Sequence, residues 1–313
     1  MQGPMKILLF GAGGQVGWEL QRSLAPLGRL TALGHAEGDL EQPVRDRILR
    51  ERPQVIVNAA AYTAVDKAEA EPQRAFRVNG EAVGEMALAA AELGALLVHY
   101  STDYVFDGAK TSPYGVDDPT APLSVYGASK LAGEQAIRAA AGCRHLIFRT
   151  SWVYAVRGSN FAHTILKRAC SMDRLQIVAD TFGVPTSAEL LADVTALAVH
   201  RLQHTAPQVA HGIGPVAAAK DHDGLLGTYH LVPAGETTWH GYGSFLIEAA
   251  RARGLPITVA AGDIAPVPAS AFPAPARRPL NSRLDNRLLE QRFGLHLPDW
   301  RMHVGRFVAE IAG

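Results

Sequence analysis

The sequence predicts an α/β protein with a doubly wound parallel sheet and a smaller C-terminal lobe. Short apolar runs, each with the length of a buried strand, alternate at least five times with segments of helical periodicity. A glycine-rich turn separates the first run from the first helix, and small or polar residues follow several later runs. Ligands of such sheets bind outside the carboxyl ends of the strands. We therefore expect the functional residues in the turns that follow the strands.

The length of the chain sets its domain organisation. Its 313 residues suffice for one large α/β unit, or for one domain with a smaller lobe. We expect a dinucleotide-binding domain with the catalytic residues over 1–154 and mainly a substrate-binding lobe over 155–313. Some segments of the second half are expected to return to the first domain.

Composition and charge exclude several classes of partner. Lys+Arg and Asp+Glu both number 30, so the net charge is zero and no basic surface favours nucleic acid. The two cysteines cannot build a disulfide framework and fit a reducing compartment. The N-terminus has no basic segment followed by a long apolar stretch, and the chain has no run of 18 apolar residues. We expect a cytoplasmic protein that binds neither nucleic acid nor membrane.

The first strand and the turn after it indicate a dinucleotide. Residues 6–10 form a short apolar run that stops at Gly11, and Gly14 and Gly17 follow before a segment of helical spacing. Glycines let the backbone approach a pyrophosphate, while the helix N-terminus supplies free N–H groups and a positive dipole end. A glycine triplet alone is a weak signal, but its place between strand and helix predicts a Rossmann-type cofactor site.

The end of the second strand bears on the choice of cofactor. Residues 29–33 should form this strand, which in NAD-binding proteins ends on an acid that holds the ribose 2′-hydroxyl. Here the strand is followed by Gly34 and His35, and the first aspartate is Asp39. The missing acid favours NADPH, with NADH still possible, and no arginine follows the strand directly to decide the question.

The next elements continue the alternation. Residues 41–50 are expected to be helical, 53–58 to form the third strand and 74–93 to form an alanine-rich helix that ends at Gly94. The small residues 59–61 at the end of the third strand either leave room for a ligand or let a helix pack closely. Both explanations remain open.

The stretch from 95 to 130 carries the chemistry. Residues 95–100 read as a buried strand, and Ser-Thr-Asp at 101–103 follows it. Tyr126 and Lys130 are four residues apart and share one face of a helix. A fixed ammonium beside a phenol favours the phenolate and brings its proton within working range. We expect Tyr126 as proton donor, Lys130 as the group that tunes it and the Thr102 hydroxyl at the same reacting oxygen, although a surface ring with a solvated amine has the same spacing.

The second half is less regular. Residues 130–141 continue the helix and 145–150 form another strand, after which the lobe is expected to begin near Tyr154. Residues 205–226 have no apolar period and are expected to be a surface loop. Four histidines in or beside this loop match no metal-ligand spacing and are expected to be solvated: His204, His211, His222 and His230.

Two features lie near the C-terminus. Thr237 and Thr238 form a plausible start for a helix over 242–253. Three arginines after a Pro-rich segment either meet a diphosphate or are solvated, and the sequence does not decide between the two: Arg277, Arg278 and Arg283.

The motifs together carry a resemblance that covers nearly the whole chain. They are the glycine turn, Asn58-Ala-Ala, AYTAVDKAE at 61–69, STDYVFDG at 101–108, YGASKLAGE at 126–134, FRTSWVY at 148–154 and GTYHLV at 227–232. This set resembles the extended short-chain dehydrogenase/reductases and, within them, the dTDP-4-dehydrorhamnose reductase family. Residues 180–186 match a further family motif, except that Thr181 replaces its glutamine.

The resemblance implies an activity and a set of site residues. The reaction would be NADPH-dependent reduction of the C4 keto group of dTDP-4-dehydro-β-L-rhamnose to dTDP-L-rhamnose, a step in dTDP-rhamnose biosynthesis for cell-surface polysaccharide. Tyr126, Lys130 and Thr102 match the family's catalytic residues. The cofactor-binding positions would be Gly11, Gly14, Gln15, Val16, Asp39, Leu40, Ala61, Tyr62, Thr63 and Tyr100, together with Tyr126 and Lys130. The sugar nucleotide would meet Thr102, Asp103, Trp152 and Asn160.

The resemblance also implies a metal and a partner. Some family members bind Mg²⁺ through glutamates at a dimer contact, and Glu19, Glu189 and Glu310 occupy matching positions here. Oxygen ligands suit Mg²⁺, although nothing in the spacing of these residues would have revealed a metal. A homodimer is the matching expectation.

Two other functions remain open. The first is another sugar-nucleotide enzyme of the extended group, such as an epimerase, a dehydratase or a different reductase. Dehydratases usually carry Asp-Glu after the strand-end Thr, whereas Asp103-Tyr104 follows Thr102 here, which favours simple reduction. The second is a non-catalytic NADP-binding subunit, like the regulatory subunit of methionine adenosyltransferase. The presence of Thr102, Tyr126 and Lys130 together favours an enzyme.

Overall fold

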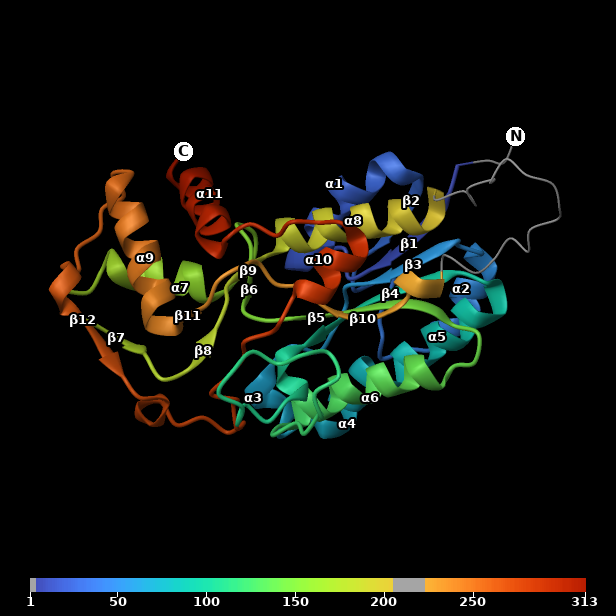
Figure 1. The fold of residues 1–313 in the computed structure, drawn as a ribbon, viewed down its shortest axis with the longest axis horizontal. Coiled ribbons are helices and arrows are strands. Elements are labelled where there is room, and N and C mark those ends of the chain that lie inside the picture. The colour runs from blue at the N-terminus through green and yellow to red at the C-terminus, as the bar shows by residue number, and fades with distance from the viewer. Residues whose placement is uncertain (1–3, 205–222) are drawn as a thin grey trace.

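The computed structural model describes residues 4–204 and 223–313. A large parallel sheet with helices on both faces adjoins a smaller lobe (Figure 1). The six strands lie in the order β10-β5-β4-β3-β1-β2, and all neighbours are parallel. In chain order they are β1 (Lys6–Phe10), β2 (Arg29–Leu33), β3 (Val55–Asn58), β4 (Leu96–Thr102), β5 (Arg144–Thr150) and β10 (Gly227–His230). The doubly wound fold class is confirmed.

The sheet is buried on both faces, which is why its central strands are almost continuously apolar. Leu9, Val57 and Val98 pack on the face covered by three helices: α1 (Gln15–Leu24), α8 (Ala188–His204) and α10 (Arg287–Phe293). Leu8 and Ile56 point to the other face, where the covering helices are α2 (Arg45–Glu51), α5 (Ala82–Leu93) and α6 (Val125–Ala139). Two short helices, α3 (Val65–Ala68) and α4 (Pro72–Phe76), lie beside α6 (Figure 1).

Two helices differ from the sequence-based expectation. The helix expected from residue 41 begins at Arg45, because Pro43 disfavours the helical conformation of the residue before it. The expected helix over 74–93 begins earlier, with α4, and continues through a π-helical segment, Arg77–Glu81, into α5. It ends at Gly94, which has φ +64° and caps α5 in the left-handed conformation.

Within the described residues, three helices and three short two-stranded sheets form the lobe. Its apolar core includes Tyr154, Tyr242, Leu246 and Trp300. The helices are α7 (Phe161–Ala169), α9 (Trp239–Ala252) and α11 (Trp300–Ala312). The strand pairs are β6 (Val153–Tyr154) with β9 (Thr186–Ser187), β7 (Leu175–Val178) with β12 (Ile264–Val267), and β8 (Phe182–Gly183) with β11 (Thr237–Thr238).

Three elements of the second half belong to the large sheet and its helices. Helix α8 packs on α1, β10 pairs with β5 at the sheet edge, and α10 covers that edge. Most of the loop expected over 205–226 lies outside the described residues, while Asp223–Leu225 forms a 3₁₀ turn. His230 is fully buried in β10, so the expectation that it is solvated was wrong. The expectation failed because β10 pairs with β5 in the sheet, and the pattern of short apolar runs does not predict this pairing.

No helix in the described ranges has both the length and the apolar character that a membrane crossing requires. This finding covers residues 4–204 and 223–313.

The start of α9 gives a stability prediction. The Thr238 side chain caps this helix, and its Oγ1 accepts a hydrogen bond from the Gly241 N–H at 3.0 Å. We expect Thr238→Ala to lower the free energy of unfolding by about 1 kcal/mol, because one N-terminal N–H of the helix loses its acceptor. Thr238→Ser keeps the hydroxyl and is the matched control. Chemical denaturation checks both, and equal losses in the two variants would contradict the capping role.

Candidate active site

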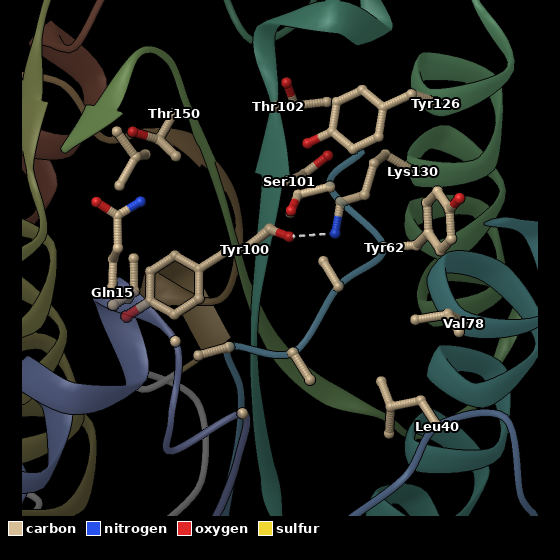
Figure 2. A pocket seen from close by; sticks show the side chains of 18 of the residues that line it. Gln15, Leu40, Tyr62, Val78, Tyr100, Ser101, Thr102, Tyr126, Lys130 and Thr150 are labelled. Carbon is tan, nitrogen blue, oxygen red and sulfur yellow. Dashed lines mark hydrogen bonds between the residues drawn. The ribbon is translucent and has the colours of Figure 1, made fainter. Parts of the chain in front are cut away.

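A cleft of about 810 Å³ runs along the carboxyl edge of the sheet. Figure 2 shows side chains from several elements that converge on it. It is lined by the residues that follow β1, β2, β3, β4 and β5, by the start of α6 and by Trp239 of the lobe. The turns that the sequence placed at strand ends therefore lie along one continuous cavity.

The glycine turn lets strand β1 and helix α1 approach each other closely. Gly11 has φ +82°, and a Cβ on it would lie 2.5 Å from the backbone nitrogen of Ala60. A Cβ on Gly17 would lie 2.0 Å from the Gly11 carbonyl oxygen. Gly14 precedes α1 and provides no side-chain cap for the first N–H groups of the helix, and Gly14, Gln15 and Val16 line the cleft. This arrangement can hold a pyrophosphate.

The residues expected along a cofactor lie on the cleft wall. Gly11, Gly14, Gln15, Val16, Asp39, Leu40, Ala61, Tyr62, Thr63 and Tyr100 all line it. The backbone N–H of Tyr62 is held by Asn79 Oδ1 at 2.9 Å, and its hydroxyl donates to Glu71 at 2.9 Å. The Tyr100 hydroxyl lies 2.5 Å from Thr195 Oγ1 on α8. Both rings therefore have fixed orientations.

The end of the cleft at Asp39 and Leu40 contains residues that sequence reasoning missed. Val78 lies near Leu40 and adds an apolar patch at this end (Figure 2). Arg74 lines the same end and pairs with Glu41 at 2.6 Å. The sequence shows no arginine directly after β2, and Arg74 comes instead from α4, which only the fold brings to this place.

Thr102 and Tyr126 meet at the end of β4. Thr102 Oγ1 donates to Asp103 Oδ1 at 3.0 Å and accepts the backbone N–H of Tyr104 at 3.2 Å. Tyr126 stands in the first turn of α6, whose N-cap is Ser124, and its hydroxyl has a hydrogen bond with Thr102. Burial raises the pKa of Tyr126 to about 12, although that hydrogen bond opposes the shift. The phenol is therefore protonated at neutral pH and can donate a proton.

Lys130 lies one turn further along α6 and is almost fully buried. Its Nζ donates to the Tyr100 carbonyl oxygen at 2.7 Å, shown by the dashed line in Figure 2, and lies 3.3 Å from His99 Nε2. We expected its ammonium to lower the pKa of Tyr126. Burial instead raises that pKa, and the Lys130 Nζ contacts β4.

Asp103 is buried beside the Tyr126–Thr102 pair. Burial raises its pKa to about 6, although hydrogen bonds from Ser282 and Thr102 oppose the shift. The Thr150 Oγ1 atom in the same cleft is also buried and has no hydrogen-bond partner in the described part of the chain. Such an atom is available to a bound molecule.

The shifted pKa of Asp103 predicts a pH dependence of stability. Its folded-state pKa exceeds the value of 3.8 expected for the unfolded chain, so its contribution is fully present below that value. It is lost as pH rises through about 6. We expect wild type to lose roughly 2–3 kcal/mol relative to Asp103→Asn between pH 3 and pH 7. Denaturation curves of both proteins across this range test it, and a constant difference would contradict it.

The lobe side of the cleft is aromatic. Trp152 stacks on Trp239 with ring centroids 3.7 Å apart, and it has a positive φ of 47°. A Cβ on Gly183 would lie 2.6 Å from the Trp152 indole, so this glycine makes room for the ring. Asn160 caps α7, and its Nδ2 donates to Gln15 Oε1 at 2.9 Å. The sequence singled out Trp152 and Asn160, but it gave no role to Trp239.

The three C-terminal arginines have different partners. Arg278 pairs with Asp66 at 2.7 Å, and Arg283 pairs with Glu236 at 3.2 Å and lies over the Phe182 ring. Arg277 is exposed. These pairs hold the segment after β12 against α3 and the lobe. Whether an arginine meets a diphosphate stays a prediction.

The three glutamates expected to bind Mg²⁺ lie near one another. Burial and the charges of Glu189 and Glu310 raise the pKa of Glu19, whereas Arg22 opposes the shift. Arg22 lies 3.6 Å from Glu19, and Arg306 lies 3.6 Å from Glu189. Within the described ranges, no three His, Cys, Asp or Glu side chains are placed to hold a metal ion. The metal and the homodimer stay predictions.

The fold and this cleft together define the class. A parallel sheet with a glycine turn after β1 and a Thr–Tyr–Lys set at its carboxyl edge is the architecture of the extended short-chain dehydrogenase/reductases.

Comparison with known proteins narrows the class to a family. A family model described as the RmlD substrate binding domain matches residues 5–312. The dTDP-4-dehydrorhamnose reductase of Burkholderia thailandensis is 49% identical over 309 residues, which cover 98% of this chain and 99% of that protein. The protein of the same name from Escherichia coli K12 is 49% identical over 313 residues, with 98% of both chains covered. The chain belongs to this family of oxidoreductases.

Solved structures of proteins with the same name have the same fold as this chain. A dTDP-4-dehydrorhamnose reductase from Clostridium acetobutylicum superposes with a TM-score of 0.84 at 30% identity, covering 99% of this chain and 100% of that one. The Bacillus anthracis enzyme, solved in complex with NADP, has a TM-score of 0.82 at 30% identity over 98% of this chain and 99% of that one.

Proposed function

We propose that this protein reduces the C4 keto group of dTDP-4-dehydro-β-L-rhamnose to dTDP-L-rhamnose with NADPH. The observation that carries the proposal is the shared cleft of the glycine turn and the Thr102–Tyr126 pair. Relatives that are 49% identical over the whole chain bear the name of this activity.

The residues present fit a dinucleotide. The free N–H groups at the start of α1 and the close backbone approach at Gly11 suit a pyrophosphate. Leu40 and Val78 offer an apolar surface to the adenine, and Tyr62 and Tyr100 line the middle of the cleft. A bound NADPH would supply the hydride, and NADH is the alternative cofactor.

The protein's own residues supply the proton and the orientation. Tyr126 is protonated at neutral pH and would donate its proton to the substrate oxygen at C4. The Thr102 hydroxyl lies beside the phenol and would hydrogen-bond the same oxygen. Asp103 and Trp152 line the part of the cleft next to this pair and would meet the sugar, while Asn160 at the start of α7 would meet the diphosphate.

The test is oxidation of NADPH by the purified protein. We expect stoichiometric turnover with dTDP-4-dehydro-L-rhamnose and little or none with the matching UDP sugar. Turnover is measured as the loss of the absorbance of reduced nicotinamide. Oxidation with neither sugar, despite measured NADPH binding, would contradict the proposal and favour the non-catalytic NADP-binding subunit.

A further inference from the structure

Lys130 ends a buried chain of three polar side chains, of which the other two have no role in the proposed reaction. It consists of Asn58 at the end of β3, His99 in β4 and Lys130 on α6. Their exposures are 1%, 0% and 2%. Because these groups are almost inaccessible to water, their hydrogen bonds must be made within the protein.

The directions of these hydrogen bonds follow from one end of the chain. The Ala60 backbone N–H can only donate, and it donates to Asn58 Oδ1 at 3.1 Å. Asn58 Nδ2 therefore faces His99 Nδ1, 3.2 Å away, and it too can only donate. His99 Nδ1 must accept this bond, so the imidazole is neutral and carries its hydrogen on Nε2.

The same direction continues to Lys130. The Nε2–H of His99 points at Lys130 Nζ, 3.3 Å away. If Lys130 were an ammonium, its N–H groups would face the Nε2–H of His99, and neither side could accept a hydrogen bond. A neutral amine accepts the hydrogen bond from His99 through its lone pair. The amine still has hydrogens to donate to the Tyr100 carbonyl oxygen at 2.7 Å. All the hydrogen bonds of the chain are satisfied only with an amine.

We propose that His99 is a positioning residue that donates its Nε2–H to Lys130 and so accommodates Lys130 as a neutral amine. This inference rests on the proposed reduction for its use. There, Tyr126 gives its proton to the substrate and becomes a phenolate. With a pKa of about 8, Lys130 exchanges between ammonium and amine near neutral pH, and a proton that the ammonium loses replaces the one that Tyr126 gave up. Lys130 is left as the amine that His99 holds, and solvent then supplies the proton that the reduction consumes.

The surroundings of Lys130 agree with a group that changes charge. Burial lowers the pKa of Lys130 to about 8, and the charge of Glu134 one turn later on α6 opposes the shift. Glu134 itself is bound by Arg149 through two hydrogen bonds, of 2.9 and 2.7 Å. From β4, the facing titratable group is His99, whose pKa is held low by burial and by the Lys130 charge. Tyr126 shares the helix face of Lys130.

The first test uses the cofactor-free protein and ¹⁵N-labelled histidine. We expect the NMR signal of His99, identified by its loss in His99→Asn, to show a protonated Nε2 and an unprotonated Nδ1 at pH 7. The opposite tautomer, or a doubly protonated ring, would overturn the inference. The tautomer is measured in the wild-type protein, and a variant is needed only to assign the signal. Asn58→Asp offers a second assignment, because it should perturb the His99 signal.

The second test uses pH profiles. His99→Asn keeps a polar atom near Asn58 but removes the donor to Lys130, so the amine is less favoured. We expect the alkaline limb of turnover, and the lysine titration seen by ¹³C NMR without cofactor, to move up by roughly one pH unit. His230→Asn makes the same change at another buried strand histidine and is the matched control, with no such shift. Equal behaviour of the two variants would overturn the inference.

These outcomes separate the two proposals. Absence of turnover by wild type with the sugar nucleotide would refute the reduction but leave the His99 tautomer to be measured. A reversed tautomer in an enzyme that turns over normally would refute the role of His99 alone.

Discussion

Tyr126→Phe should lose roughly 10²–10⁴-fold in turnover while it still binds NADPH. The substitution removes one hydroxyl and leaves the ring, which packs edge-on against Tyr104 with centroids 5.5 Å apart. Because burial raises the pKa of Tyr126 to about 12, the phenol is protonated and can serve as the proposed acid at the end of β4. Without this hydroxyl, the developing alkoxide of the substrate would have to take its proton from water.

Two measurements make the result specific. Titration of NADPH fluorescence should give nearly the same dissociation constant for variant and wild type, since the hydroxyl faces Thr102. Tyr104→Phe removes a neighbouring phenol and should lose less than about tenfold. A Tyr126→Phe protein that folds, binds NADPH and reduces the substrate at the wild-type rate would show that another group is the acid.

Much of this site could be predicted because parallel sheets gather strand ends at one edge. Apolar runs located β1, β3, β4 and β5, and the residues after them line one cleft. The glycine turn was predictable because its close approaches, as at Gly17, exclude any side chain. Local sequence patterns were therefore enough to predict those site residues that lie together in one short segment.

The remainder depended on contacts between distant segments. Arg74 and Trp239 reach the cleft from elements far along the chain, and no local pattern marks either residue. His230 looked like a loop residue, but its strand joins β5 at the sheet edge. The charge of Lys130 likewise depends on His99, 31 positions earlier. Spacing along one helix suggested a Lys–Tyr pair and could not show this third group.

The ion pair between α6 and β5 is the other place where one substitution should have a large effect. Glu134 is fully buried on α6, and Arg149 on β5 binds it through Nε at 2.9 Å and Nη2 at 2.7 Å. Arg149 is itself 2% exposed and also donates to the Val116 carbonyl. Burial acts to raise the pKa of Glu134, but Arg149, together with Ser101 and Arg138, outweighs it and the pKa is lowered. The pair thus fixes α6, with Tyr126 and Lys130, against the sheet.

Arg149→Met should lower the free energy of unfolding at neutral pH by about 3–5 kcal/mol, because the buried carboxylate loses its buried cation and keeps the half-exposed Arg138 as an ion-pair partner. The double variant Glu134→Gln/Arg149→Met removes the stranded charge and should recover a large part of this loss. The lowered pKa of Glu134 gives a second test, by pH. The contribution of Glu134 to the free energy of unfolding is present above its unfolded pKa of 4.5 and is lost as the pH falls through its folded pKa. The gap between wild type and Arg149→Met should therefore narrow in acid. A loss below about 1 kcal/mol, the same at all pH values, would mean that the pair contributes little to holding α6 in place.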